Sequence, residues 1–261
     1  MNRTVGFLDI LGFKSRLEED GIVEVARAYE EAVKMAKNLN RMFQAGQDTS
    51  PSVRSIDLSI ERCKMTIFSD SIILVSSDDS ADSCLSLLMM ARNLFVMMLA
   101  AGFPLRGGIT AGELHYNEVE SIVLGPALTK AYLLESSQEW CGISIDNSVW
   151  HCYPRAVVGV DNPLLRPMFP NYNVPLKGGG FKSMRIINWR ANLVAKEGSL
   201  ALLQKARVDR NKPKWAATIK FLQWAKEIRD LYPKDGADRL PEVYIIWIGD
   251  IPPPFPHGDD L

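Results

Sequence analysis

The segment TVGFLDILGF, residues 4–13, decides the predicted fold. It is a short apolar run that contains one acid, Asp9, and reaches a glycine turn at Gly12. Beyond the turn, residues 22–43 carry apolar side chains at helical spacing. This pattern predicts a strand, a tight glycine turn and a long helix. An acid inside an apolar strand is unusual, which makes Asp9 the first candidate functional residue.

The pattern that follows completes a split βαβ fold. Residues 64–77, KMTIFSDSIILVSS, read as two short strands with Asp70 at the tip of their hairpin. The further predicted elements are, in order, a helix capped by Asp79 and Ser80 and ending at Gly102, a strand over 103–113, a short strand over 122–124, a helix opened by Pro126, and a strand pair that turns over 177–180. The order β-α-β-β-α-β predicts an α+β, ferredoxin-like split βαβ sheet with additional strands and helices.

The composition excludes several classes of protein. The chain has 261 residues, with 30 basic and 31 acidic side chains, so no broad charge drives it toward nucleic acid or anionic membrane. Its four cysteines are scattered, without metal-ligand or disulfide spacing. The most apolar stretch, residues 85–102, is interrupted by Arg92 and Asn93 and is too short for a bilayer crossing, which predicts a buried helix. We expect no signal peptide and a cytoplasmic location.

Two carboxylates carry the predicted chemistry. In a split βαβ sheet the first and third strands are neighbours in the centre, which brings Asp9 and Asp70 together. Two carboxylates that converge beside a glycine turn are typical of a two-metal site for an in-line phosphoryl reaction. The alternative is that Asp9 caps the following helix and Asp70 only forms a hairpin turn, both ordinary uses of aspartate.

Five motifs in chain order resemble those of the class III nucleotidyl cyclases. They are FLDILGF at 7–13, IFSDS at 67–71, LRGGI at 105–109 with Gly112, Leu124-Gly125 with Ala131, and LKGGG at 176–180. The family usually has glycine before the hairpin aspartate, where this chain has Ser69. The resemblance covers about residues 5–189. It implies a cyclase catalytic domain over residues 1–190. The pattern beyond it predicts a helix over residues 199–231 that Pro213 breaks and a mobile tail over 252–261, which together form a helical extension and flexible tail over 191–261.

The resemblance also implies the site and its partners. The implied site residues are the metal residues Asp9, Ile10 and Asp70, the triphosphate-binding amides of Ile10, Leu11, Gly12 and Phe13, and Lys177. Each site would hold two Mg²⁺ or Mn²⁺ ions. The protein would be a head-to-tail homodimer in which Lys177 reaches the triphosphate from the other subunit. The implied reaction is attack of the ribose 3′-hydroxyl on the α-phosphorus, which yields a 3′,5′-cyclic nucleotide and pyrophosphate.

The chain departs from the family where an arginine normally contacts the transition state. The family has an asparagine and an arginine one turn apart on the junction helix, where this chain has Thr129 and Leu133. Arg106 and Lys130 are the candidate replacements for that arginine. Alternatively, Arg106 is a strand-end arginine that pairs with a surface acid, Lys130 lies on a solvated helix face, and Thr129 packs the helix.

A second departure concerns the base. Purine cyclases read the base through polar side chains at two positions where this chain has Thr66 and Ile122. Together with GPAL at 125–128, AYLLE at 131–135, VPLK at 174–177 and INW at 187–189, this resembles the bacterial pyrimidine cyclases of the Pycsar anti-phage defence system. UTP is the expected substrate, with CTP open, because a smaller ring suits a narrow pocket with few polar groups. The product, cyclic UMP or cyclic CMP, would activate a separate effector protein.

Two other functions stay open. A catalytically silent nucleotide-binding module that regulates a partner is favoured by Thr129 and Leu133. A different two-carboxylate phosphoryl transferase, such as a diguanylate cyclase or polymerase domain, ranks last. Such domains have an acid-rich hairpin tip, whereas the tip at residues 68–71 contains the single acid Asp70.

Overall fold

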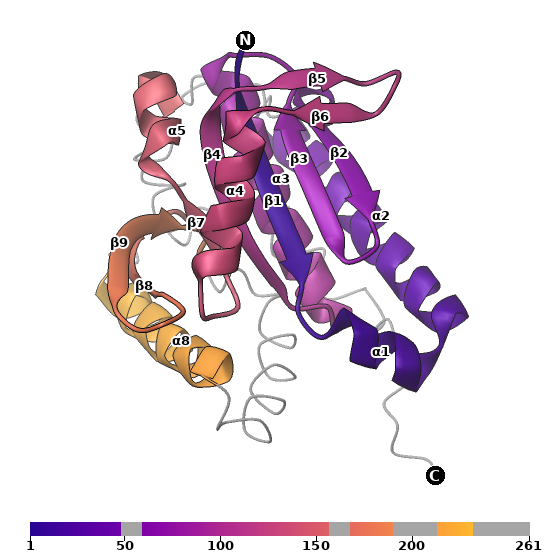
Figure 1. The fold of residues 1–261 in the computed structure, drawn as a ribbon, viewed down its shortest axis with the longest axis vertical. Coiled ribbons are helices and arrows are strands. Elements are labelled where there is room, and N and C mark those ends of the chain that lie inside the picture. The colour runs from indigo at the N-terminus through magenta and orange to yellow at the C-terminus, as the bar shows by residue number, and fades with distance from the viewer. Residues whose placement is uncertain (48–58, 157–167, 190–212, 232–261) are drawn as a thin grey trace.

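The computed structural model describes residues 1–47, 59–156, 168–189 and 213–231 of the chain. Its elements are, in order, β1 (Asn2–Ile10), α1 (Phe13–Asp20), α2 (Ile22–Gln47), η1 (Ile60–Arg62), β2 (Cys63–Phe68), β3 (Ser71–Ser76), α3 (Ala81–Ala100), β4 (Leu105–Glu113), β5 (His115–Asn117), β6 (Ile122–Leu124), α4 (Pro126–Ser137), β7 (Ile143–Ile145), α5 (Asn147–Cys152), β8 (Asn171–Pro175), β9 (Phe181–Ile186) and α8 (Pro213–Leu231). Figure 1 shows a sheet with helices on both faces.

The strand order confirms the predicted fold class. A seven-stranded sheet runs in the order β2-β3-β1-β4-β7-β9-β8, and β5 and β6 form a separate two-stranded sheet. The pairs β2·β3, β3·β1 and β1·β4 are antiparallel, whereas β4 and β7 are parallel. Because β1 lies between β3 and β4, the first four strands have the arrangement of a split βαβ fold. The protein is therefore an α+β, ferredoxin-like fold with three strands added at one edge.

The face of the sheet under α2 and α3 forms the main core. Leu8 and Ile10 of β1 belong to this core and are 0% and 3% exposed. Among the described helices, α3 alone is long and apolar enough to cross a membrane, yet 94% of its most apolar window is buried inside the protein. The predicted buried helix over residues 85–102 is therefore confirmed. Its N-terminus is capped as expected, because the Ser80 hydroxyl accepts a hydrogen bond from the Ser83 amide at 3.1 Å.

The short helix α4 lies across the opposite face, over β1 and β4 (Figure 1). It packs so closely that a Cβ atom at Gly108 would lie 2.6 Å from the carbonyl oxygen of Ala131 and 3.0 Å from the amide nitrogen of Glu135. The Thr110 hydroxyl adds a 2.8 Å hydrogen bond to the Ala127 carbonyl. Glycine at position 108 therefore allows α4 to pack directly onto the backbone of β4.

The C-terminal helix α8 packs against β8 and the main core. Phe221 of α8 makes ring contacts with Trp140, Tyr172 and Trp189, at centroid distances of 5.0, 5.3 and 5.4 Å. The predicted late helix over residues 199–231 is seen from Pro213 onward. The predicted boundary between residues 190 and 191 and the predicted tail over 252–261 lie outside the described residues.

Candidate functional site

The structure brings Asp9 and Asp70 together at one end of the β1·β3 pair. Asp9 is paired with Ser71 across the two strands, and Asp70 is the preceding residue in the β2–β3 turn. The amide of Ile10 donates a 2.9 Å hydrogen bond to the main-chain carbonyl of Asp70, which fixes the turn against the end of β1. Ser69 has a φ of 55°, in the left-handed region that favours glycine, the residue that the cyclase family has there.

Asp9 lies in an environment that opposes its ionisation. Burial raises its pKa from 3.8 to about 6, and the carboxylates of Glu135 and Asp70 add to the increase. The opposing charges are those of Arg106 and Lys177, which lower the pKa of Asp9. Unfavourable carboxylate pairs of this kind are frequent at functional sites, where a substrate or cation compensates the charge.

Arg106 is held by a buried acid rather than by a surface acid. Arg106 lies directly opposite Asp9 in the register of the antiparallel strands β1 and β4. Its Nε donates to Glu135 Oε1 at 2.5 Å, and its Nη1 donates to the Gln138 carbonyl at 3.3 Å. The two side chains are 12% and 4% exposed, so the ion pair is largely shielded from water. The alternative of a surface ion pair for Arg106 is therefore wrong, because its partner is on the inner face of α4.

Glu135 is a member of the site that the sequence analysis did not single out. Ala127, Ala131 and Glu135 are all buried and recur every four residues, which places them on one face of α4. An acid in an otherwise small and apolar stripe is the signal that could have identified it. Glu135 holds Arg106 and acts on Asp9, so it connects α4 to the carboxylate site.

The turn between β1 and α1 offers fewer free amides than expected. The Ile10 amide is bonded to the Asp70 carbonyl, and the Leu11 amide donates to the Pro104 carbonyl at 2.8 Å. The prediction that these two amides wrap a triphosphate is therefore wrong, because the sheet already uses them. The side chain of Ile10 is also buried in the core, so only its main-chain carbonyl remains as a metal ligand.

The start of α1 is the remaining candidate anion site. This helix was not predicted separately; Gly21 ends it before α2 begins. Its N-cap is Gly12, with a φ of 78°, and no side chain of the described residues caps it. No acid lies in its first turn, so the partial positive charge of the helix N-terminus is uncompensated. Gly12 and Phe13 thus lie at a helix start, and their contact with a triphosphate stays a prediction.

Lys177 lies on an exposed loop near Asp9 of its own chain. Its amide donates to the Ser137 carbonyl at 2.8 Å, at the end of α4. The next three residues are glycines with φ of 82°, 97° and 85°, and a Cβ on any of them would meet nothing within 4 Å. The loop is therefore free to approach a ligand. The charge of Lys177 already acts on Asp9 within the single chain, whereas the resemblance implied a lysine from a second subunit.

Two further predicted residues, Lys130 and Thr129, are exposed on α4. Lys130 pairs with Asp146 at 2.6 Å, and its charge is not among those that shift the pKa of Asp9. The side chain of Lys130 is 51% exposed, so the alternative of a solvated helix face is confirmed, with the ion pair to Asp146 added to it. Thr129 is exposed and does not pack the helix, which excludes the packing alternative.

The two positions expected to face the base are on different sheets. Thr66 is half-buried on β2 of the large sheet, opposite Ile73. Ile122 is 39% exposed on β6 of the small sheet. An ion pair between Lys64 and Glu118, at 3.0 Å, joins β2 to the β5–β6 hairpin. The structure therefore places the two positions on different sheets that this ion pair joins.

The donor set fits Mg²⁺ or Mn²⁺. No group of three or more His, Cys, Asp or Glu side chains within the described ranges could hold a metal ion. Mg²⁺ commonly takes one or two protein carboxylates and completes its octahedron with water and substrate phosphates. Asp9 and Asp70, together with the Ile10 carbonyl, supply such an oxygen-only set.

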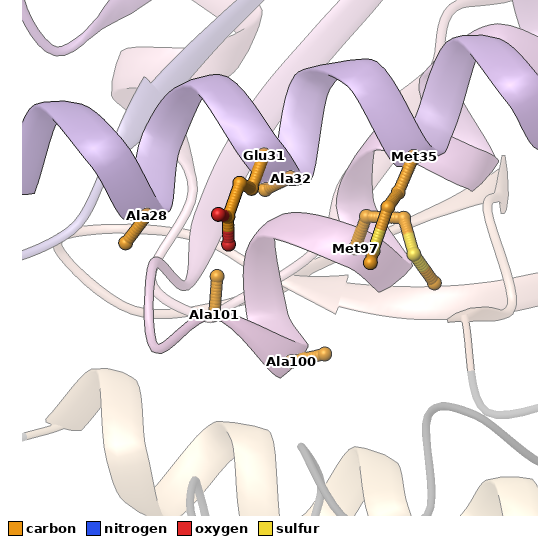
Figure 2. A pocket seen from close by; sticks show the side chains of 7 residues that line it. All are labelled: Ala28, Glu31, Ala32, Met35, Met97, Ala100 and Ala101. Atoms are coloured by element: carbon orange, nitrogen blue, oxygen red, sulfur yellow. The ribbon is translucent and has the colours of Figure 1, made fainter. Parts of the chain in front are cut away.

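A small apolar pocket lies apart from this site, between α2 and α3 (Figure 2). It is lined by Ala28, Glu31, Ala32, Met35, Met97, Ala100 and Ala101. These helices cover the face of the sheet opposite α4, and Glu31 is the single ionisable group in the lining. The pocket therefore supplies no second group for acid–base or metal chemistry.

Comparisons with known proteins find structural likeness at low sequence identity. No protein-family model and no curated protein matches the chain. The catalytic core of a rhodopsin-guanylyl cyclase with converted specificity, in complex with ATPαS, aligns with a TM-score of 0.44 at 14% identity, over 71% of this chain and 94% of that chain. The monomeric guanylyl cyclase domain of the RhoGC fusion protein from the aquatic fungus Blastocladiella emersonii aligns with a TM-score of 0.39 at 14% identity, over 72% and 94%. Both alignments are too loose to carry an argument about function.

Proposed function

We propose that this protein is a metal-dependent nucleotide cyclase. The observation that carries the proposal is the placement of Asp9 and Asp70 at one end of the β1·β3 pair, beside the uncapped start of α1. The raised pKa of Asp9 adds to it, because it marks a carboxylate cluster that a divalent cation would stabilise. The ordered cyclase-like motifs of the sequence supply the reaction class.

Each group of the site has a role in this proposal. Asp9 and Asp70 bind the divalent ions, which when bound lower the pKa of the ribose 3′-hydroxyl and neutralise the leaving pyrophosphate. The start of α1 faces the terminal phosphates. Arg106, fixed by Glu135, offsets charge at the α-phosphate, and Lys177 does so at the triphosphate tail. Lys130 has no part in the site of its own chain, because Asp146 holds it.

We infer that the substrate is a pyrimidine nucleotide, UTP before CTP. The support is chemical: Thr66 and Ile122 stand where purine cyclases have polar base-reading side chains. A half-buried threonine and an isoleucine offer a small, largely apolar contact that cannot satisfy the polar edge of adenine or guanine. In a bacterial anti-phage system of the Pycsar kind, the cyclic UMP produced would act as a second messenger on a separate effector protein.

The purified protein, incubated in turn with ATP, GTP, CTP and UTP in the presence of Mn²⁺, tests both proposals. We expect cyclic UMP as the main product, separated by chromatography. An Asp70→Asn variant should form no product, whereas Asp79→Asn, a change at an exposed acid, should leave the rate unchanged. Cyclic products from ATP or GTP but from neither UTP nor CTP would overturn the pyrimidine assignment. No cyclic product from any of the four nucleotides would overturn the cyclase.

The exposed apolar side chains around the site support a homodimer. Those above a third exposed on β2, β6, α4 and β9 are Ile67, Phe68, Ile122, Leu124, Tyr132, Leu133 and Phe181. Tyr132 also makes an edge-to-face contact with Phe7 of β1, at 5.4 Å, so its exposed ring is held in place. Large exposed apolar side chains of this kind are typical of a protein interface. We propose that two copies pack head to tail and cover some of these side chains.

Mixing two inactive variants tests the dimer and the assignment of Lys177. The charge of Lys177 acts on Asp9 of its own chain, so the proposal that Lys177 completes the site of the partner subunit in the dimer needs a direct test. Asp70→Asn and Lys177→Ala should each be inactive alone. After mixing and subunit exchange they should recover about a quarter of wild-type activity, because half of the dimers carry one intact site of two. No recovery, with exchange shown by mass-tagged subunits, would place Lys177 in the site of its own chain.

The second candidate function is a catalytically silent nucleotide-binding module. It is favoured by the exposure of Thr129 and of Leu133, which is 57% exposed, at the two positions where the family has an asparagine and an arginine. Such a module would bind UTP with measurable affinity and form no cyclic product with any divalent ion. The product assay above, combined with a nucleotide-binding titration, distinguishes it from the enzyme.

A further inference from the structure

Tyr29 of α2 carries a buried hydroxyl that the fold does not use. The side chain is 8% exposed. Its hydroxyl is fully shielded from solvent and has no hydrogen-bond partner within the part of the chain that the structure describes. A buried donor without a partner destabilises a folded protein, and such groups in native structures often mark a functional site.

The ring of Tyr29 packs against the segments on either side of the turn between β1 and α1. It makes an edge contact with Phe13, the first residue of α1, at 6.3 Å, and a tilted contact with Phe103 at 5.7 Å. Phe103 precedes Pro104, whose carbonyl accepts the amide of Leu11. The ring is therefore clamped between two segments that flank the end of β1, and packing rather than hydrogen bonding fixes its position.

Asp70 is the acid whose charge acts on this hydroxyl. Burial raises the pKa of Tyr29, and the Asp70 carboxylate raises it further, so the hydroxyl keeps its proton and remains a donor. The main-chain carbonyl of Asp70 is already bonded to the Ile10 amide. The carboxylate of Asp70, in contrast, makes no hydrogen bond or ion pair with any described residue. One unpaired donor and one unpaired acceptor thus lie at the same end of the sheet.

We propose that Tyr29 is a positioning residue for Asp70: its hydroxyl donates a hydrogen bond to one carboxylate oxygen of Asp70 while the other oxygen binds a divalent cation. This role rests on the proposed metal site but not on the identity of the nucleotide. Donors of this kind orient metal-binding carboxylates, and their loss weakens metal binding without removing a ligand. The role gives a function to a buried hydroxyl that has no partner among the described residues.

The test is the Mn²⁺ affinity of Tyr29→Phe, measured by calorimetric titration of the whole chain without nucleotide. We expect the affinity to fall roughly tenfold. The melting temperature of the metal-free variant should equal or exceed that of the wild type, because no hydrogen bond is lost and an unpaired buried hydroxyl is removed. Opposite changes in metal affinity and metal-free stability are not expected of a tyrosine with a purely structural role.

Tyr153→Phe is the matched control. Tyr153 is 5% exposed, and its hydroxyl is also buried without a partner in the described ranges, but it lies near Thr4 and Cys84 rather than Asp70. Its removal should leave Mn²⁺ affinity unchanged. Asp70→Asn, which removes a ligand, should abolish binding.

The outcomes separate this proposal from the proposed function. Wild-type Mn²⁺ affinity in Tyr29→Phe, or an equal loss in Tyr153→Phe, would overturn the positioning role and leave the cyclase standing. Mn²⁺ binding that depends on both Asp70 and Tyr29, in a protein that forms no cyclic nucleotide, would support the positioning role and overturn the cyclase. Mn²⁺ binding that survives Asp70→Asn would overturn the positioning role.

Discussion

The two faces of β1 differ in what their side chains contribute. Leu8 and Ile10 face α2 and α3 and are almost fully buried among apolar side chains. Phe7 and Asp9 face α4 and are only partly buried. A single strand therefore supplies the core on one side and the candidate site on the other, which follows from the alternation of side chains along a strand.

The two faces of the sheet also differ in what they contribute to the stability of the fold. The α2–α3 face is stabilised by burial of apolar surface, about 25 cal/mol for each Å² removed from water. The α4 face carries Arg106 and Glu135 as a largely buried ion pair, and beside them Asp9 with a raised pKa. Buried charges contribute little net stability and are costly when unpaired. The α4 face, which carries the proposed site, is therefore not a main source of stability.

The largest expected effect concerns activity on the α4 face. Asp9→Asn should lower the rate of cyclic nucleotide formation at least about 1,000-fold, because a metal ligand worth several kcal/mol in the transition state is lost. The free energy of unfolding should not fall, because an unfavourable charge is removed. Product formation and urea unfolding, measured on the same sample, check both parts. A marked loss of stability would show that Asp9 belongs to the core instead.

The neighbouring residue on the other face should respond in the opposite way. Leu8→Ala should lower the free energy of unfolding by about 2–5 kcal/mol, because Leu8 is fully buried and the change leaves a cavity. The fraction that remains folded should keep most of its activity. Urea unfolding and the activity per folded molecule are the measurements. A loss below about 1 kcal/mol would mean that the two faces do not differ as described.

At the contact of α4 with β4, a substitution should change both stability and activity, each by less than the changes above. Gly108→Ala should cost about 1–3 kcal/mol, because its Cβ would lie 2.6 Å from a main-chain oxygen of α4. The shift of α4 should also displace Glu135 and reduce activity.

Gly6→Ala on β1 is the control for this change. Its Cβ would meet its nearest neighbour, Ile109, at an ordinary 3.5 Å. In thermal unfolding, the melting temperature of Gly6→Ala should be well above that of Gly108→Ala. Equal melting temperatures for the two variants would contradict the close packing of α4.

The smallest expected effect is a pH dependence of stability without metal. The pKa of Asp9 is about 6 in the folded protein and near 3.8 when unfolded, so between these values the folded state binds more protons. Stability should therefore decrease as the pH rises from about 4 to about 6 and be constant above that range with respect to this group. The difference between wild type and Asp9→Asn in urea unfolding, measured across this range, isolates the effect. A difference that does not change with pH would contradict the raised pKa.

The sequence predicted the topology because local and long-range signals agree. The acid in TVGFLDI, the hairpin tip at Asp70 and the capped apolar helix α3 are each recognisable from residue type and spacing. Once their order is known, the split βαβ arrangement places β1 beside β3, and the convergence of Asp9 and Asp70 follows. The short β7 and the helix α5, of 3 and 6 residues, were not predicted, because no turn signal and no opening proline of the kind that marks β6 and α4 was recognised beside them.

The details of the site depend on contacts that no local pattern encodes. The use of the Ile10 and Leu11 amides is decided by Asp70 and Pro104, which are far away in the sequence. The pairing of Arg106 with Glu135 joins residues 29 positions apart, and it depends on how closely α4 packs on β4. Tyr29 looks like an ordinary core residue in the sequence, and only the structure shows that its hydroxyl has no partner among the described residues.

The central claim is that Asp9 and Asp70 bind the same divalent cation, and a double-mutant cycle on Mn²⁺ affinity tests it most directly. Mn²⁺ binding is measured by calorimetry, with a non-hydrolysable UTP analogue present, for wild type, Asp9→Asn, Asp70→Asn and the double variant. A shared ion predicts that each single change costs most of the affinity and that the second adds little to the first. Free-energy losses that simply add, or a single variant that binds as tightly as the wild type, would contradict it.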